Sequence, residues 1–127
     1  MKSRAKGSST KKQASSQNAS SALSVRQPFA ELILRGIKRI EYRSIPTHKR
    51  ERVYIYASKV PRNDPSSWAI VKRQPGDLPT GMLVGTVEIV GCDGEPRNYR
   101  WKLARPKRLK KPVKPKRMPQ PVFFSPF

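Results

Sequence analysis

The sequence has very few of the side chains that form disulfides or hold metal ions. Among its 127 residues there is one cysteine, Cys92, and one histidine, His48. A single cysteine excludes an internal disulfide, and structural zinc sites need four ligands drawn mainly from these two residue types. We therefore expect no metal site and no cofactor. The low cysteine content fits a reducing, cytoplasmic setting best.

The sequence also lacks a long apolar run and a residue pair typical of nucleophilic catalysis. No stretch is long enough to span a bilayer, and no apolar signal-peptide core is present, so we expect no membrane association. His48 follows Pro46 and Thr47 in a basic loop, and Cys92 precedes a turn that begins at Asp93. We interpret them as an exposed loop residue and a strand-end residue, not as a base and a nucleophile.

Acidic residues are scarce, and both ends of the chain have none. The sequence holds 28 Lys and Arg against 8 Asp and Glu, a formal charge of +20 with a pI near 11.1. Residues 1–21 carry five cations and residues 101–127 carry nine, without any acid. Such blocks favour polyanions, nucleic acid first. The alternative is that these segments only keep the protein soluble, although segments with that role usually contain Asp and Glu as well.

The N-terminal segment is too polar to take part in a core. Residues 1–21 contain one methionine and no aromatic residue, so they bury too little apolar surface to offset the entropy of ordering. We predict a disordered basic tail over 1–21 and one folded domain over 22–127. The tail also resembles an organelle transit peptide, but it has no amphipathic period and more lysine than arginine.

About six short strands and one or two short helices are expected, without regular alternation. The apolar patterns predict strands near residues 23–25, 38–44, 51–58, 82–90, 99–104 and 122–127. A helix of about two turns is expected from Pro28 to Gly36, and a second over 66–72 with Ser66 or Ser67 as its cap. This order argues against a doubly wound parallel sheet. It favours a small barrel or an α+β fold.

Proline and glycine mark special positions in this pattern. The basic segment at about 104–121 contains five prolines, which exclude a helix or a central strand, so we expect it to be extended and mostly at the surface. A turn is predicted from Asp93 to Pro96. Gly85, inside a strongly apolar strand, predicts a bulge or a close approach of backbone.

Aromatic residues alternate with other side chains in two of the expected strands. Tyr54, Tyr56, Tyr99 and Trp101 can stack on bases, as in many proteins that bind single-stranded RNA. The alternating aromatics of a small barrel are more often core residues or cross-strand pairs, and we favour that interpretation.

Charged residues follow the first helix at an informative spacing. In a regular strand Glu41 and Arg43 share one face, and Lys38 joins them only if it lies in the turn after Gly36. Arg43 offers planar two-point recognition of an anion, whereas Lys38 is a mobile point charge. The spacing alone leaves two alternatives open: a structural ion cluster that closes one end of a barrel, or the wall of a ligand site.

The spacing Gly-x-Lys-x-x-Glu-x-Arg resembles the signature of the ASCH domain, a branch of the PUA-like superfamily. The blocks ALSVRQPFAELIL, YIYAS, LPTGMLVGTVEIV and YRWKL resemble its small bacterial single-domain members in the same order. The resemblance covers most of residues 22–127. It implies a mainly β, α+β fold, a small PUA-like β-barrel with a cleft floored by the signature residues. It also implies RNA or a nucleotide-like molecule as the ligand.

We therefore predict an RNA- or nucleotide-binding module whose basic ends grip phosphates. The expected ligand-contacting residues are Arg26, Gln27, Lys38, Glu41, Arg43, Ser58 and Lys116. Arg26 and Gln27 precede a helix whose free N–H groups favour anions. The sequence departs from the family pattern in one place near its C-terminal end, where a Lys-Gly pair is replaced by Lys116-Arg117.

Two other functions remain open at this stage. Some small family members hydrolyse RNA or an acylated nucleoside, so a ribonuclease or nucleoside amidohydrolase with Lys38 and Glu41 as catalytic residues is one alternative. The amidohydrolase members tend to have threonine at the position of Glu41. The other alternative is an adaptor whose basic ends bind an acidic protein partner, such as a ribosome- or translation-related factor.

Overall fold

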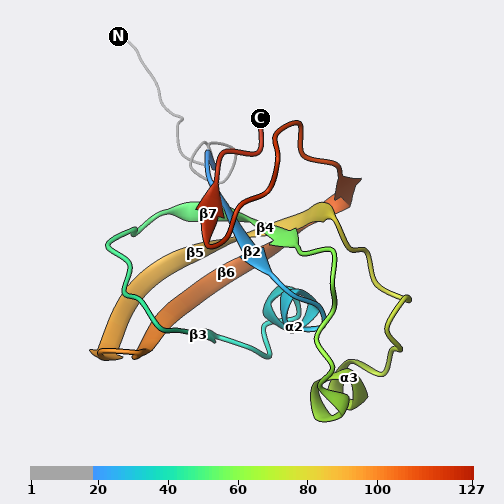
Figure 1. Cartoon of the computed structure of the whole chain (residues 1–127), viewed down its shortest axis with the longest axis horizontal. Coiled ribbons are helices and arrows are strands. Elements are labelled where there is room, and N and C mark those ends of the chain that lie inside the picture. The colour runs from blue at the N-terminus through green and yellow to red at the C-terminus, as the bar shows by residue number, and fades with distance from the viewer. Residues whose placement is uncertain (1–18) are drawn as a thin grey trace, which may run out of the picture.

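Six strands form one curled sheet, with two short helices outside it (Figure 1). The computed structural model describes residues 19–127, so most of the predicted tail lies outside the described residues. The elements in chain order are β2 (Ala22–Val25), α2 (Phe29–Leu34), β3 (Ile40–Arg43), β4 (Arg52–Ala57), α3 (Pro65–Val71), β5 (Met82–Glu95), β6 (Asn98–Val113) and β7 (Phe123–Phe124). The predicted mainly β, α+β class with about six strands and one or two short helices is confirmed.

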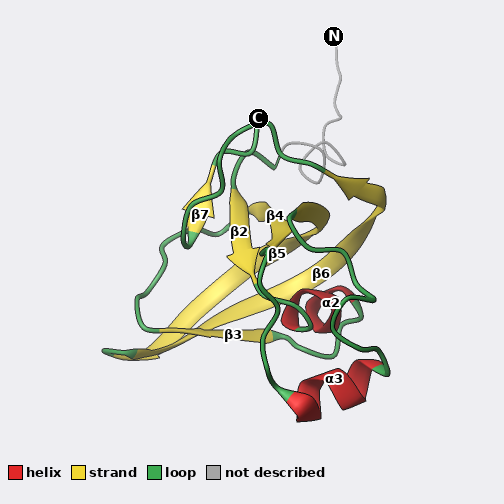
Figure 2. Ribbon diagram, turned by 45° about the vertical axis from the view of Figure 1, so that its right-hand side comes forward, coloured by secondary structure: helices red, strands yellow, loops and turns green. Residues whose placement is uncertain are grey.

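The sheet curls into a half-barrel with an open seam (Figure 2). Its strand order is β3-β6-β5-β4-β2-β7. The β2–β4 pair is parallel and the other pairs are antiparallel. The edge strands β3 and β7 therefore border the seam. Contacts across the seam, from β3 to β2 or β7, are made by side chains and not by a backbone ladder.

The core fills the concave side of this sheet. Its fully buried members include Leu23, Val53, Ile55, Val87, Ile89 and Trp101. From α2, Ala30 and Ile33 pack against them. Tyr56 is also buried, and its ring meets Phe124 edge to face at 5.3 Å. The interpretation of the strand aromatics as core residues is thus confirmed for Tyr56 and Trp101.

The helices begin and end largely where the sequence predicts. Pro28 precedes α2, and Gly36 follows it at a φ of +75°, a left-handed conformation that glycine adopts without strain. The prediction of a serine cap for α3 is wrong. Asp64 is its N-cap residue, and the Ser66 and Ser67 hydroxyls donate to the Asp64 carboxylate from inside the first turn.

The β5–β6 hairpin is longer than the sequence predicts. The predicted turn from Asp93 to Pro96 is shifted, because β5 continues to Glu95. Likewise β6 continues through two prolines, Pro106 and Pro112, to Val113. Register shifts interrupt the β5–β6 ladder around both prolines, so neither has to donate a regular ladder hydrogen bond. Beyond residue 102 this strand has no β3 partner, which fits the expected absence of a central strand.

Gly85 lies where three segments meet, and both expectations for it are confirmed. The ladder slips on both sides of it, toward β4 and toward β6. A Cβ atom at this position would lie 2.4 Å from Leu34 Cδ2 and 2.6 Å from the Lys107 carbonyl oxygen. Only glycine therefore lets α2 and β6 approach β5 so closely.

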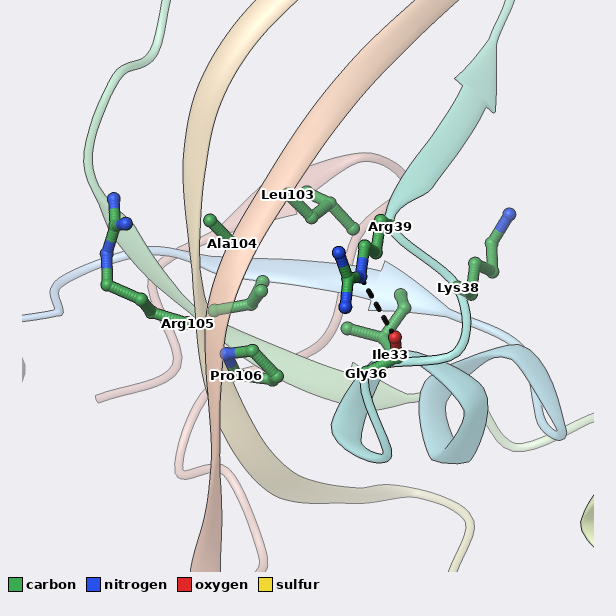
Figure 3. A pocket seen from close by; sticks show the side chains of 9 residues that line it. Ile33, Gly36, Lys38, Arg39, Leu103, Ala104, Arg105 and Pro106 are labelled. Carbon is green, nitrogen blue, oxygen red and sulfur yellow. Dashed lines mark hydrogen bonds between the residues drawn. The ribbon is translucent and has the colours of Figure 1, made fainter.

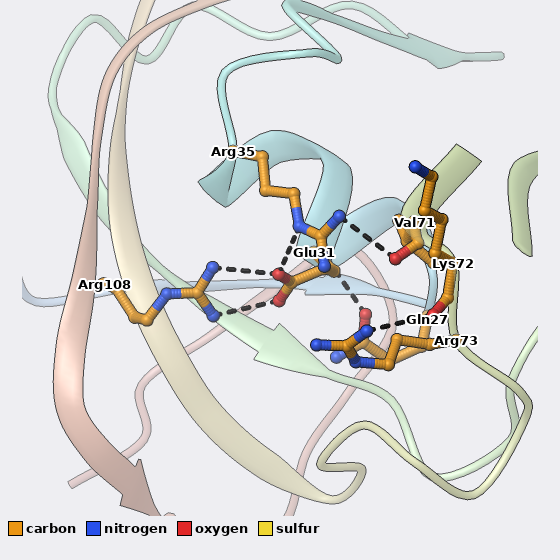
Figure 4. Close-up of polar contacts among 7 residues, drawn as sticks. All are labelled: Gln27, Glu31, Arg35, Val71, Lys72, Arg73 and Arg108. Carbon is orange, nitrogen blue, oxygen red and sulfur yellow. Dashed lines mark hydrogen bonds and ion pairs between the residues drawn. The ribbon is translucent and has the colours of Figure 1, made fainter.

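A buried carboxylate holds α2 in place on the sheet (Figure 4). Both guanidinium NH groups of Arg108 donate to the two Glu31 oxygens at 2.9 Å. Arg35 donates to the same carboxylate at 2.7 Å and to the Val71 carbonyl of α3 at 3.1 Å. Burial opposes ionisation of Glu31, but the hydrogen bonds from Arg108 and Arg35 outweigh it and lower its pKa. One acid thus joins α2, α3 and β6.

In the described part of the chain, no helix is both long and apolar enough to cross a membrane. Residues 19–127 also contain no group of three or more His, Cys, Asp or Glu side chains that could hold a metal ion.

We predict that Gly85→Ala destabilises the fold by about 1–3 kcal/mol, because backbone atoms must move to admit the methyl group. Urea unfolding of the variant and the wild type measures the difference. Gly91→Ala is the matched control, since its new methyl group meets only the flexible Lys102 side chain, at 3.2 Å. Equal stability of the two variants would contradict the close packing described for Gly85.

We also predict that Glu31 contributes stability in a pH-dependent way. A carboxylate with a lowered folded pKa stabilises the protein above its ordinary value of 4.5 and loses this effect as the pH falls through the folded value. Glu31→Gln should therefore be less stable than the wild type near pH 7 by about 1.5–3 kcal/mol. The gap should narrow below about pH 4.5. Unfolding curves from pH 7 to pH 3 measure it, and a constant gap would refute this assignment.

Candidate functional site

An open cleft lies at the seam of the half-barrel, beside the turn that connects α2 to β3. Its volume is about 600 Å³. Its lining comes from four stretches of the chain: Ser24, Arg26, Phe29, Lys38, Glu41, Tyr42, Arg43, Ser58, Arg62, Pro121 and Val122. Five of the seven residues predicted to contact a ligand therefore lie together in one cleft.

Glu41 forms the floor of the cleft. Its β3 position alternates with Tyr42, so Glu41 points inward and is 6% exposed, whereas Tyr42 points outward and is 66% exposed. One carboxylate oxygen, Oε2, accepts a hydrogen bond from Arg43 Nε at 2.8 Å. The other, Oε1, lies 3.5 Å from Lys38 Nζ and accepts no hydrogen bond within the described structure. The acid thus holds two cations side by side.

Lys38 joins this cluster because it lies in the turn after α2, as the spacing required. The backbone N–H group of Gly36 donates to the Ile33 carbonyl at 3.0 Å, and that of Lys38 donates to the Leu32 carbonyl at 3.1 Å. These two hydrogen bonds fix the turn. Lys38 Nζ then donates to the Ile40 carbonyl at 2.7 Å. It also lies 4.7 Å from the centre of the Phe29 ring and 5.3 Å from that of Tyr42.

Arg43 connects β3 to the opposite side of the seam. Its second guanidinium nitrogen, NH2, donates to the Ser24 carbonyl of β2 at 2.7 Å. Its guanidinium carbon lies 5.5 Å from the centre of the Trp101 ring, which stacks in turn on Phe123 of β7 at 5.5 Å. Arg43 is therefore positioned from three directions, with part of its guanidinium facing the cleft.

Two further arginines border the cleft at its open end. Arg26 donates to the Val60 and Pro61 carbonyls at 2.9 and 2.8 Å, so its guanidinium is fixed to the loop that follows β4. Arg62, from the same loop, lies 4.6 Å from the centre of the Phe29 ring. The cleft therefore presents four cationic side chains and one carboxylate, which leaves it strongly positive.

The other two predicted site residues lie elsewhere. Gln27 is 1% exposed, and its amide accepts from the Glu31 N–H and donates to the Pro79 carbonyl, both at 3.0 Å. These contacts are structural and do not reach the cleft. Lys116 borders a separate hollow formed by the C-terminal segment.

Sequence reasoning missed Phe29, Tyr42 and Arg62 as lining residues. Phe29 falls within the helix expected from Pro28 to Gly36, and Arg62 stands among turn residues without any pattern. The inward direction of Glu41 carried a usable signal, because it implies that Tyr42, its neighbour in β3, points outward at the rim.

A smaller hollow of about 190 Å³ lies behind the turn, between α2 and the sheet (Figure 3). Apolar side chains such as Ile33 and Leu103 line it, and Arg39 at its edge donates to the Gly36 carbonyl at 3.2 Å. Figure 3 shows Lys38 directed away from Arg39. Lys38 lines both hollows, whereas Arg39 lines only the smaller one and does not contribute to the large cleft.

The fold and the cleft together define a small, mainly β half-barrel with a cationic site at its seam. The sequence profile of the ASCH domain family matches residues 23–112. The chain belongs to this family, which confirms the resemblance inferred from the Gly36 to Arg43 spacing.

Two mammalian proteins are similar to part of the chain. The human protein activating signal cointegrator 1 is 37% identical over 83 residues, which cover 55% of this chain and 14% of that protein. Its mouse counterpart is 36% identical over 83 residues, with the same coverage. The matched segment is therefore a small part of the length of these relatives.

We predict that Glu41→Gln lowers the free energy of unfolding by about 1.5–3 kcal/mol, because it leaves two half-buried cations without their counter-charge. Urea unfolding measures the change. Glu51→Gln is the matched control, since the Glu51–Lys49 pair is exposed, is 3.7 Å long and should contribute less than about 1 kcal/mol. Equal effects of the two substitutions would mean that the Glu41 cluster contributes no more than a surface pair.

Proposed function

We propose that this protein is an RNA-binding module that holds one nucleotide of its ligand in the seam cleft. The observation that carries the proposal is the arrangement of Lys38 and Arg43 on one buried carboxylate. Arg43 donates to Glu41, and Lys38 lies beside the same carboxylate and donates to the Ile40 carbonyl. Both cations are therefore held before any ligand arrives, so a bound anion does not have to order them. Such preorganisation increases affinity by lowering the entropic cost of binding.

The chemistry of the cleft fits a nucleotide better than a small inorganic anion. A volume of about 600 Å³ lies within the usual range for small-molecule sites. The Tyr42 ring is exposed at the rim and offers a surface on which a base can stack. Lys38 and Arg43 supply donors for phosphate or for a base carbonyl, and the Ser58 hydroxyl adds a neutral donor.

The charge outside the cleft supports a polymeric ligand. A single nucleotide needs few cations, but the chain carries a formal charge of +20. The acid-free segment 101–127 supplies much of this excess on the folded domain itself. Contacts of this kind grip phosphates without reading sequence, so the cleft is the place where preference for a base or a chain end arises. We place the protein in the cytoplasm, where a translation-related RNA is one available partner.

We predict that Lys38→Ala and Arg43→Ala each weaken RNA binding about tenfold or more, since each removes a fixed contact in the cleft. Fluorescence anisotropy with a short labelled single-stranded RNA at low salt measures the affinity. Lys11→Ala, which removes one charge from the N-terminal segment, is the matched control and should change the affinity only slightly. Wild-type affinity should also fall steeply as salt is raised.

The control variants also separate the cleft from the diffuse charge. If Lys38→Ala and Lys11→Ala weaken binding equally, the cleft contributes nothing beyond net charge and the proposal is wrong. The same conclusion follows if protein that lacks residues 1–18 binds neither RNA nor a nucleotide at low salt. Far-ultraviolet circular dichroism confirms that each variant is folded.

A further inference from the structure

Three hollows follow one another along residues 114–122, which we term the C-terminal segment. The cleft shares Ser24, Ser58 and Pro121 with a middle hollow of about 360 Å³. The middle hollow shares Lys59 and Met118, among others, with a distal hollow of about 220 Å³. Each hollow thus shares lining residues with the next, from Lys38, Glu41 and Arg43 at one end to Lys114 at the other, and we term the series the groove.

The C-terminal segment is fixed against the barrel, so the groove exists without a ligand. The Ser24 hydroxyl and N–H donate to the Gln120 and Val122 carbonyls, both at 3.0 Å. At the other end, the Lys116 and Arg117 N–H groups donate to the Pro126 carbonyl at 2.7 and 3.1 Å. Figure 1 shows this segment returning beside β2 before it reaches β7.

The cations of the groove are not used by the fold. Within residues 19–127, Arg105 and Arg108 of β6 form ion pairs with Glu88 and Glu31. In contrast, no ion pair involves the four basic residues that line the middle and distal hollows, which are Lys59, Lys114, Lys116 and Arg117. Residues 1–18 contain no acid that could neutralise them. Met118, between the hollows, is 79% exposed and offers an apolar contact at the lip.

We propose that the groove is a path for single-stranded RNA, with one nucleotide in the cleft and the following nucleotides in the middle and distal hollows. This inference rests on the proposed function and adds to it the form of the ligand. Lys59 would contact the phosphate that leaves the cleft, and the cations from Lys114 to Arg117 would contact the next ones. Successive small hollows under a fixed segment suit an unpaired chain, whereas a duplex needs a wide, open surface for its phosphates.

The test compares ligands of increasing length. Binding of the four ribonucleoside monophosphates, then of homopolymers of two to six nucleotides of the tightest-binding base, is measured at low salt. For the wild type, affinity should rise with each nucleotide until the three hollows are filled and then change little. The triple variant Lys114→Ala/Lys116→Ala/Arg117→Ala should keep the mononucleotide affinity and lose most of the gain with length.

A second triple variant serves as the matched control. Lys107→Ala/Lys110→Ala/Lys111→Ala removes the same charge from exposed β6 residues outside the groove. This control variant should retain the increase of affinity with RNA length. The groove variant should lose that increase, and its plot of log affinity against log salt should be shallower by about 2 in slope. Equal losses in the two variants would overturn the path and leave only a diffuse positive field.

The outcomes distinguish the path from the proposed function. If none of the mononucleotides or homopolymers binds the wild type, the proposed function itself fails. If mononucleotides bind in a way that depends on Lys38 and Arg43 but length brings no gain, the cleft is correct and the path is wrong. A duplex of the same length that binds the wild type as tightly as the single strand also overturns the path.

Discussion

The half-barrel is held across its open seam by the Arg43 side chain, which the Glu41 carboxylate of the same strand fixes in place. Backbone hydrogen bonds join every neighbouring strand, but none joins β3 to β2, because the sheet does not close. Arg43 spans this gap, with one end on the Glu41 carboxylate and the other on the Ser24 carbonyl. The Trp101–Phe123 stack closes the same seam beside it. Side chains therefore bridge the seam at these contacts, and the cleft lies beside them where the seam stays open.

Under the proposed function, this arrangement makes stability and ligand binding depend on the same atoms. A buried carboxylate between two cations is favourable only while all three charges are present, because removing the acid leaves cations with lost hydration. The single acid compensates fewer charges than the cleft holds, since Arg26 and Arg62 stand beside Lys38 and Arg43. The residues that line the cleft therefore carry a surplus of positive charge, and in the proposed function an anionic ligand neutralises it.

The parts of the site that the sequence predicts are those set by local geometry. The turn after Gly36 and the alternation of β3 bring Lys38, Glu41 and Arg43 together, and both depend on neighbours within eight residues. Arg62 and the C-terminal segment reach the site only through the long-range packing of β2, β4 and β7, for which no local pattern exists. The extension of β6 was missed for a related reason, because bulges opposite Gly85 accommodate prolines that a regular ladder would exclude.

The distribution of acids explains which cations of β6 are paired in the described structure. Residues 101–127 contain no acid, so each ion pair formed by their cations needs a carboxylate from an earlier element. Glu31, Glu88 and Asp93 supply these carboxylates, and the cations of β6 that pair with them lie between Arg100 and Arg108. Those pairs fix the strand to the barrel. Within residues 19–127, the cations after Val113 form no ion pair and stand beside the groove. In the proposed function, a bound polyanion would relieve their mutual repulsion.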